Sequence, residues 1–413
     1  MFVCKGFEEF FGFKRFGWIR PIFGFMNQGK YVFSQLMSFI SHNDFNSCVK
    51  RYKGDFKTKD FTCWKQFLCM AFGQLTHRES LSDTILCLAA NKEKLYHLGI
   101  GRFISKSTLS KANENRNWCI YLDFALLLIA QAKKLYADEN LLDVPLKQNV
   151  FAVDATVVDL CLSIFPWATF RKTKAALKIH AQLNLKNSIP ELVIITPASV
   201  HELKFLDVIH FEPDSFYIFD RGYIDYPRLY RLHKAEAYFI IRGRGRLRFL
   251  RHSSLSVDKT TGVMHDQVVK IKNFYPHKSY PEKLRRIVFV DTVKKKFEFL
   301  TNNFDLPAAQ IAQLYKHRWM IELFFKWIKQ HLKIKSYWGH SENAVKCQIW
   351  IAISVYVLVA IVKKQLKLNQ SLYEILQILS INIFDKMPIN QLFDETLQTN
   401  FKELNSNQLK IFN

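Results

Sequence analysis

The sequence is short of acidic residues. It has 36 Asp and Glu against 59 Lys and Arg in 413 residues, so its formal net charge is +23. A cationic surplus of this size predicts a polyanionic partner. Nucleic acid is the simplest such partner, and an anionic membrane surface is the alternative. The chain is also long enough for two or three domains with a sizeable core.

Paired cysteines and long apolar runs are missing as well. None of the eight cysteines forms a Cys-x2-Cys pair, which argues against a zinc ribbon and fits the reduced thiols of a cytosolic protein. The longest apolar run, 349–362, is shorter than the roughly 20 residues of a membrane span, so we expect a buried helix and no membrane association. Residues 1–25 lack the apolar core and cleavage site of a signal peptide. Because Met26 suits a natural start, we interpret 1–25 as an upstream extension.

The stretch 315–329 combines apolar residues with a narrow stripe of polar ones. It has no Gly or Pro, so we predict an unbroken and mostly buried helix. One arc of the helical wheel holds Tyr315, Arg318, Glu322, Lys326 and Lys329. Ion pairs between residues four apart are the plain interpretation. A carboxylate among cations in a buried seam also suits metal-dependent phosphate chemistry, with the acid on a metal and the cations on phosphates.

This spacing resembles the signature helix of the bacterial insertion-sequence transposases of the IS-four group, Tyr-x2-Arg-x3-Glu-x6-Lys. Tyr315, Arg318, Glu322 and Lys329 occupy its four fixed positions. The resemblance implies that the Glu is one of three metal ligands and that the other three residues contact phosphates of the transposon end. Lys326 and Trp319 would be helpers at the same phosphates.

Residues 150–241 have a β-rich pattern that contains the other two acids. The expected elements are strands at 150–160, 178–185 and 191–196, a helix at 201–209, a strand at 215–220, a helix at 226–236 and a strand at 238–241. This is the order of a ribonuclease-H-like fold, whose first and fourth strands lie side by side. Asp154 and Asp220 would then meet, and paired carboxylates repel unless a divalent cation neutralises them. Asp159 is the rival to Asp154, and Asp225, which also suits a helix N-cap, is the weaker rival to Asp220.

The segment before this core, 26–145, is predicted to be a helical DNA-binding domain. Its helix at 104–113 has Ser and Thr at its start and carries lysines, as do helices that enter a major groove. Base-reading and phosphate-binding side chains follow at Asn113, Asn115, Arg116 and Asn117. The alternative is an ordinary helical packing domain with a solvated polar segment.

Four further segments complete the predicted domain order. The core begins at 146–241, is interrupted by a β-rich insertion at 242–300, and resumes at 301–365 with the signature helix. A helical tail at 366–413 would pair two protomers. In the insertion, the arginines expected to track a phosphate backbone are Arg242, Arg244 and Arg246, unless they belong to a solvated loop.

The prediction is therefore an α/β transposase with a ribonuclease-H-like core, an N-terminal helical DNA-binding domain and a C-terminal helical tail. The resemblance implies that Asp154, Asp220 and Glu322 hold Mg²⁺, which Mn²⁺ can replace. It also implies cleavage and strand transfer at terminal repeats of double-stranded DNA by a homodimer in the bacterial cytoplasm. A metal-dependent nuclease of the same fold and an inactive DNA-binding repressor are the alternatives.

Two positions depart from the family pattern. Some relatives stack a flipped base on a Trp of the insertion, but no Trp lies between Trp167 and Trp319 here. The possible substitutes are Phe249, Phe274, Tyr275 and Tyr280. Relatives often carry a hydroxyl residue after the first Asp, where this chain has Ala155.

Overall fold

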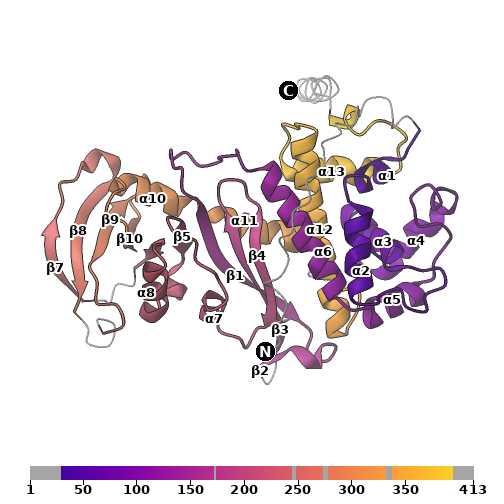
Figure 1. Cartoon of the computed structure of the whole chain (residues 1–413), viewed down its shortest axis with the longest axis horizontal. Coiled ribbons are helices and arrows are strands. Elements are labelled where there is room, and N and C mark those ends of the chain that lie inside the picture. The colour runs from indigo at the N-terminus through magenta and orange to yellow at the C-terminus, as the bar shows by residue number, and fades with distance from the viewer. Residues whose placement is uncertain (1–28, 172–173, 244–247, 273–277, 332–336, 394–413) are drawn as a thin grey trace, which may run out of the picture.

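The computed structural model describes residues 29–171, 174–243, 248–272, 278–331 and 337–393. Residues 1–25, predicted to be an upstream extension, lie outside these residues, as do Arg244, Arg246, Phe274 and Tyr275. The chain is elongated, with antiparallel strands at one end, a mixed sheet in the middle and a body of helices at the other end (Figure 1). The predicted mixed α/β class is confirmed.

One sheet of ten strands runs through the molecule in the order β2-β3-β1-β5-β6-β10-β9-β8-β7, with β4 paired to β3. Its central strands are β1 (Val150–Leu160), β2 (Thr169–Arg171), β3 (Lys174–Asn184), β4 (Pro190–Pro197), β5 (Phe216–Phe219) and β6 (Tyr238–Arg242). β1 is antiparallel to β3 and parallel to β5, and β5 is parallel to β6. The first and fourth of the predicted strands therefore lie side by side, as the sequence predicts.

The β-rich segment after β6 extends this same sheet. Its strands are β7 (Phe249–Ser254), β8 (Val263–Ile271), β9 (Leu284–Val290) and β10 (Lys296–Thr301). They pair antiparallel, and β10 joins them to β6. β7 was not expected, because its Phe-Leu-Arg-His-Ser-Ser sequence lacks alternation and most of the strand is exposed.

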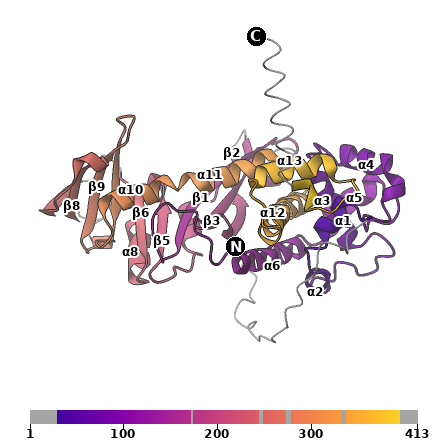
Figure 2. The same ribbon diagram turned by 90° about the horizontal axis from the view of Figure 1, so that it is seen from above.

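Helices cover both faces of the central sheet because side chains alternate along each strand. Phe151 and Val153 share a core with α7 (Leu203–Leu206) and α8 (Tyr226–Lys234). Val150 and Ala152 belong to the core of the opposite face, with α10 (Ala308–Lys316) and α11 (Trp319–Lys326). α10 and α11 follow one another along the long axis of the molecule (Figure 2).

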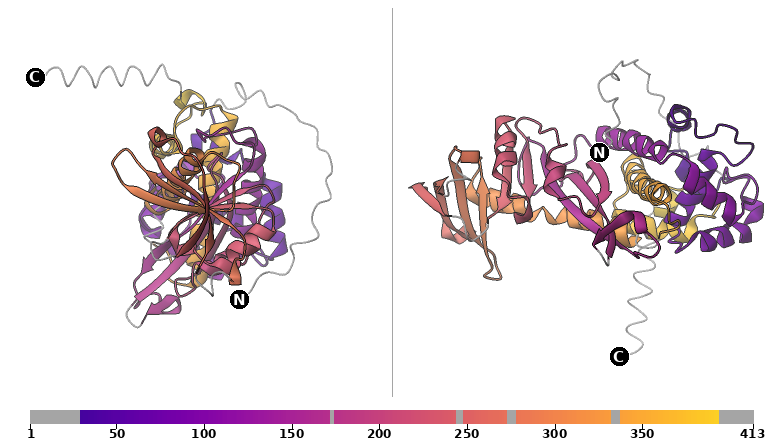
Figure 3. Two further views of the ribbon diagram at one scale, coloured as in Figure 1. Left: turned by 90° about the vertical axis from the view of Figure 1, so that its left-hand side faces the viewer. Right: turned by 90° about the horizontal axis from the view of Figure 1, so that it is seen from below.

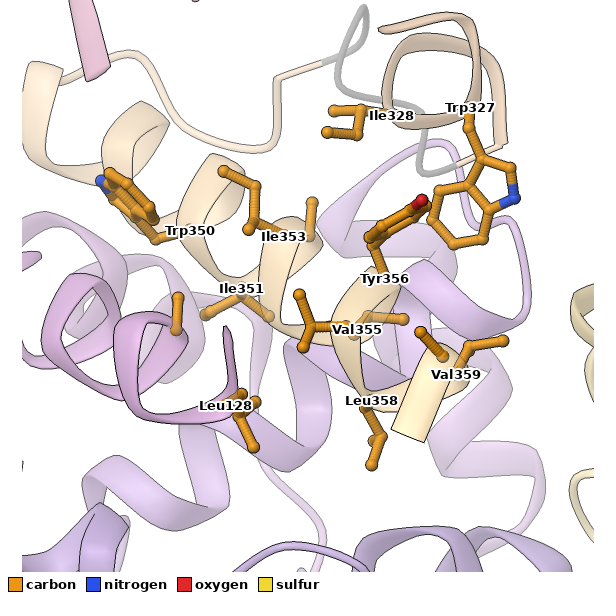
Figure 4. Close-up of a cluster of buried hydrophobic side chains, with 14 of the residues drawn as sticks. Leu128, Trp327, Ile328, Trp350, Ile351, Ile353, Val355, Tyr356, Leu358 and Val359 are labelled. Carbon is orange, nitrogen blue, oxygen red and sulfur yellow. The ribbon is translucent and has the colours of Figure 1, made fainter. Parts of the chain in front are cut away.

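The helical body surrounds α12 (Glu342–Gln365). Around it lie α1 (Val32–Met37), α2 (His42–Arg51), α3 (Cys63–Leu75), α4 (Leu81–Ala90), α5 (Lys106–Asn115), α6 (Cys119–Leu135) and α13 (Leu372–Asn382). Figure 3 shows this body from two further sides. α12 is long and apolar enough to cross a membrane, but 94% of its apolar window is buried in the protein. Its side chains pack with Leu128 of α6 and with Trp327 and Ile328 beside α11 (Figure 4). The expectation of a buried helix is confirmed.

The segment after α12 returns to the start of the described chain. The backbone N–H groups of Val32 and Phe33 donate to the carbonyls of Asp385 (2.9 Å) and Ile383 (3.1 Å). The Gln35 amide donates to the carbonyl of Met387 at 2.7 Å. Residues up to 393 therefore close the helical body.

Candidate active site

Two aspartates meet on the face of the sheet that α11 covers. The parallel register of β1 and β5 places Ala152 beside Ile218 and Val153 beside Phe219. One residue further along, the same register brings Asp154 beside Asp220, which directly follows β5. Alternation turns both side chains toward α11, since Ala152 and Ile218 belong to that face's core.

The turn between α10 and α11 provides the cation next to these acids. Arg318 Nη1 donates to Asp154 Oδ2 at 3.2 Å, and Arg318 Nη2 donates to the Glu322 carboxylate. The Tyr315 hydroxyl lies 3.4 Å from Asp220 Oδ1. Arg318 is 17% exposed and Asp154 is 21% exposed, whereas Glu322 is 57% exposed. The three predicted acids thus lie around one arginine, the first two well inside and the third at the rim.

The signature stretch is not the unbroken helix that the sequence predicts. α10 ends at Lys316 and α11 begins at Trp319. Between them the backbone tightens: the N–H of Arg318 donates to the carbonyl of Tyr315, and the N–H of Ile321 donates to the carbonyl of Arg318, three residues back. After α11, residues 327–331 form a π-helix. A pattern without Gly or Pro does not reveal such changes of pitch.

The expected burial of this stretch is also wrong for one face. Trp319 (48% exposed) and Leu323 (44% exposed) reach the surface, together with Glu322 and Lys326. The opposite face, with Ile321 and Phe324, is buried as predicted.

An open pocket of about 450 Å³ collects most of the predicted residues. Its lining is Asp154, Ala155, Thr156, Asp220, Arg318, Glu322, Phe325, Lys326 and Lys329. Lys329 Nζ also donates to the carbonyl of Val157 at 2.6 Å and so ties the π-helix to β1. Among the predicted phosphate ligands, Tyr315 and Trp319 lie outside this lining. Arg242 also lies outside it, with its guanidinium 5.3 Å from the centre of the Phe297 ring.

The electrostatics of the pocket centre on Asp154. Burial raises the pKa of its carboxyl to about 6, while the N–H of Ala155 and the Arg318 guanidinium oppose the rise and the charge of Asp220 adds to it. Burial likewise raises the pKa of Tyr315. Ionisation of Asp154 in this pocket therefore costs free energy, and a nearby cation offsets that cost.

The donor set suits a hard divalent cation, since it offers carboxylate oxygens next to a buried charge. In the described residues, however, no three Asp, Glu, His or Cys side chains converge closely enough to hold one ion. The reason is Arg318, whose guanidinium stands between Asp154 and Glu322. A shared ion requires the arginine to release at least one of these carboxylates.

The two acids considered as alternatives to Asp154 and Asp220 lie outside the pocket. Asp159 also lies on β1, but its side chain is on the opposite face of the strand from that of Asp154. It is exposed. Asp225 accepts from the N–H of Arg228 and caps α8. Two residues near the carboxylates were not predicted: Glu202, whose charge acts on Asp154, and Tyr223, whose buried hydroxyl has no hydrogen-bond partner in the described chain. Neither belongs to a motif, so only the fold reveals them.

Several residues predicted to contact DNA make hydrogen bonds within the protein. Asn113 is buried and accepts from the Gln66 amide at 2.7 Å, and Asn117 accepts from the N–H of Cys119. Arg116 donates to the carbonyl of Thr62 at 2.9 Å and to that of Phe61. Asn113 is therefore buried away from any DNA, whereas Asn115 and Asn117 are exposed, and DNA contacts at Asn115, Arg116 and Asn117 stay a prediction. Tyr280, a suggested stacking residue, is likewise buried and pairs with His233 at 2.6 Å.

A mixed sheet that gathers carboxylates and cations in an open pocket defines an enzyme class that works on phosphodiesters. The family model described as "Transposase DDE domain" matches residues 145–358, more than half of the chain. The chain belongs to this family and is a DDE transposase, an enzyme that cleaves and transfers DNA strands. A second model, described as a domain of unknown function (DUF4372), matches residues 28–101.

Similar proteins carry matching descriptions. "Putative transposase y4zB" of Sinorhizobium fredii is 29% identical over 285 residues, 68% of this chain and 78% of that protein. "Probable transposase for insertion sequence element IS5377" of Geobacillus stearothermophilus is 27% identical over 262 residues, 63% of this chain and 67% of that protein. A solved piggyBac transposase synaptic complex with hairpin DNA aligns with a TM-score of 0.40 at 11% identity, over 90% of this chain and 82% of that chain.

Proposed function

We propose that this transposase belongs to the IS-four group, binds the terminal inverted repeats of its insertion sequence, and cuts and joins DNA with Asp154, Asp220 and Glu322 as metal ligands. The observation that supports this most strongly is the pairing of two aspartates on parallel strands under an Arg318 that also holds Glu322. Residues from three distant parts of the chain meet there with the chemistry that phosphodiester cleavage needs.

The cations of the pocket bind and orient the scissile phosphate. Arg318 Nε is buried and has no hydrogen-bond partner among the described residues, so a phosphate oxygen would satisfy it. Lys326 and Lys329 line the same pocket and add positive charge where negative charge develops during strand cleavage. The Tyr315 hydroxyl holds Asp220 from the other side.

The metal is proposed to be Mg²⁺, with Mn²⁺ able to replace it. When bound, it would activate the attacking oxygen and stabilise the leaving one. Arrival of a DNA phosphate gives Arg318 a new partner and releases Asp154 and Glu322 toward the cation. In this proposal, Arg318 neutralises the negative charge of Asp154 and Glu322 until DNA binds.

The strand order supports a ribonuclease-H-like core, which we propose together with the domain order predicted from the sequence. The proposal includes an N-terminal DNA-binding domain, a β-rich insertion and a homodimer on two transposon ends. The α12 and α13 helices then belong physically to the body that carries the N-terminal domain.

The test is cleavage of a labelled duplex that carries the terminal repeat of the element. Wild type is compared with Asp154→Asn and Glu322→Gln, each with Mg²⁺ and with EDTA. We expect nicking at the end of the repeat that requires Mg²⁺ and is lost in both variants, while DNA binding persists. Asp159→Asn is the matched control, because it changes an exposed acid of the same strand, and it should cut normally.

Two results would contradict the proposal. Folded wild type that binds the repeat without cutting it would favour a DNA-binding repressor. Cutting that never joins the freed 3′ end to a second strand would favour a nuclease of the same fold.

A further inference from the structure

A second pocket, of about 580 Å³, lies in the helical body between the loop 52–61 and α5. Thirteen residues line it: Tyr52, Lys53, Gly54, Phe56, Thr58, Lys59, Phe61, Thr108, Lys111, Ala112, Asn115, Arg116 and Asn117. Four of them are cationic and none is acidic, which predicts an anionic ligand. Three are aromatic and five carry hydroxyl groups or amides, which suits a ligand with planar, hydrogen-bonding parts.

We propose that this pocket binds a DNA strand, with its phosphates on Lys53, Lys59 and Lys111 and one unpaired base against Phe56. The loop belongs to the segment matched by the domain of unknown function, so the proposal gives that domain a ligand and a place to hold it. It rests on the proposed function only in naming DNA as the polyanion.

The three lysines are available for an external anion. Each is exposed, and none has an ion pair within the part of the chain that the structure describes. The acids of the loop are engaged elsewhere: Asp55 accepts from the N–H of Cys63 at 2.7 Å, and Asp60 pairs with Lys65 and Arg102. The pocket therefore keeps an uncompensated positive charge.

Phe56 gives the pocket an aromatic surface that serves no packing purpose. Its side chain is 72% exposed at the loop, although a phenyl ring of this size is usually buried. The Lys57 ammonium lies 5.4 Å from its ring centre. Bases stack on such rings once they have left the duplex, because pairing and stacking hide their faces inside it.

The loop backbone is held in a form that lysine does not favour. Lys53 (φ 51°) and Lys57 (φ 56°) both adopt the left-handed conformation, where glycine is more stable. Replacing either by glycine therefore removes a charge while it relieves the backbone. A loss of binding in such a variant is therefore not expected to come from backbone strain.

The opposite wall of the pocket is a fixed surface. Thr108, Lys111 and Asn115 are spaced three and four residues apart and so share one face of α5. The end of α5 is anchored by Asn343, whose amide donates to the carbonyls of Asn113 (2.8 Å) and Arg116 (2.6 Å). Asn343 opens α12, so the wall is attached to the central helix of the protein.

The test measures binding of a labelled oligodeoxynucleotide to the full chain by fluorescence anisotropy, as a single strand and as a duplex, over a range of salt. Lys53→Gly and Lys111→Ala should each weaken binding about three- to ten-fold and lower the salt slope by about 0.7 to 0.9, as expected for one lost phosphate contact. Lys367→Gly is the matched control, since Lys367 is an exposed lysine at φ 54° outside the pocket. It should bind like wild type.

Phe56→Leu tests the base contact. It should weaken single-strand binding about ten-fold and leave duplex binding within about two-fold, because only the single strand offers a free base. Equal losses for the two forms, or no loss, would overturn this part. An effect of Lys53→Gly no larger than that of Lys367→Gly would overturn the phosphate part, as would a wild type that binds neither form.

The two proposals fail separately. Pocket variants that bind like wild type, in a protein that still nicks its terminal repeat, would overturn the pocket and leave the catalytic proposal standing. If the pocket variants lose binding but the wild type does not cut DNA, the catalytic proposal is overturned and the pocket proposal stands.

Discussion

Replacing Asp154 by Asn should abolish cleavage and at the same time make the folded protein more stable. The Asp154 carboxyl is mostly buried, and its pKa of about 6 lies well above the ordinary 3.8. Asparagine has nearly the same shape as the carboxylic acid but never ionises. The variant therefore keeps the packing and removes the charge that the fold tolerates poorly.

The size of the effect follows from the pKa. The gap between 3.8 and about 6 corresponds to about 3 kcal/mol, at about 1.4 kcal/mol per unit. Between these two pH values the folded state holds the proton more tightly than the unfolded state. Stability falls as pH rises through that window, and the full penalty is present above pH 6. The advantage of Asp154→Asn should thus be about 3 kcal/mol at pH 8 and small near pH 4.

The assay is thermal unfolding of wild type and Asp154→Asn at pH 8 and at the acid end of the range where both fold. A difference of about 3 kcal/mol raises Tm by a few degrees in a chain of this size. The Tm difference between the two proteins is compared at the two pH values, because the effect of pH on all other titratable groups is the same in both and cancels. Asp159→Asn, which changes an exposed acid of β1, should leave Tm unchanged at both pH values.

Mn²⁺ provides an independent check on the same variant. An ion bound only by the folded protein stabilises it, so Mn²⁺ should raise the Tm of wild type at pH 8 and not that of Asp154→Asn. The reasoning is refuted if Asp154→Asn is less stable than wild type at pH 8, or if the gap is the same at both pH values.

Three other outcomes are expected. Arg285→Ala should lower the free energy of unfolding by roughly 3–5 kcal/mol in urea denaturation, because it leaves Asp266 buried without its partner at 2.7 Å; a loss below about 1 kcal/mol would contradict this. Gly73→Ala should lower Tm, since a Cβ there would lie 2.5 Å from Trp338, and an unchanged Tm would show that the ring moves freely. The His180 imidazole, whose pKa burial lowers to about 4, should stay neutral in NMR titrations down to about pH 5; its contribution to stability is lost as pH falls from about 6.5 toward 4, and a midpoint near 6.5 would contradict its burial.

The sequence predicts those features that depend on repeating patterns. The apolar residues all round α12 predict its burial, and the order of strands and helices predicts that β1 and β5 are neighbours, which brings Asp154 beside Asp220. The order of elements from β1 to β6 also follows from period and length, except for the three-residue strand β2, which was not expected. These properties come from local residues, which a linear sequence displays directly.

Other features depend on side chains that meet across the fold. Nothing local indicates that Arg318 holds two carboxylates at once, or that Arg116 donates to backbone carbonyls of a distant loop. The cationic pocket brings Lys53 and Lys111 together although they are far apart in sequence, and only the segment that contains Lys111 was predicted to bind DNA. Charge in a sequence shows that an anion is bound somewhere, and only the packing shows where.

The closure of the helical body by its last segment has a consequence for synthesis. Gln35 and Met387 are hydrogen-bonded although 352 residues separate them, and α12 fills the space between the first helices. The ribosome must therefore deliver almost the whole polypeptide before the N-terminal helices can complete their core. Until then their apolar faces are exposed to chaperones and proteases, and we expect a message cut short before α12 to yield a fragment that lacks much of its core.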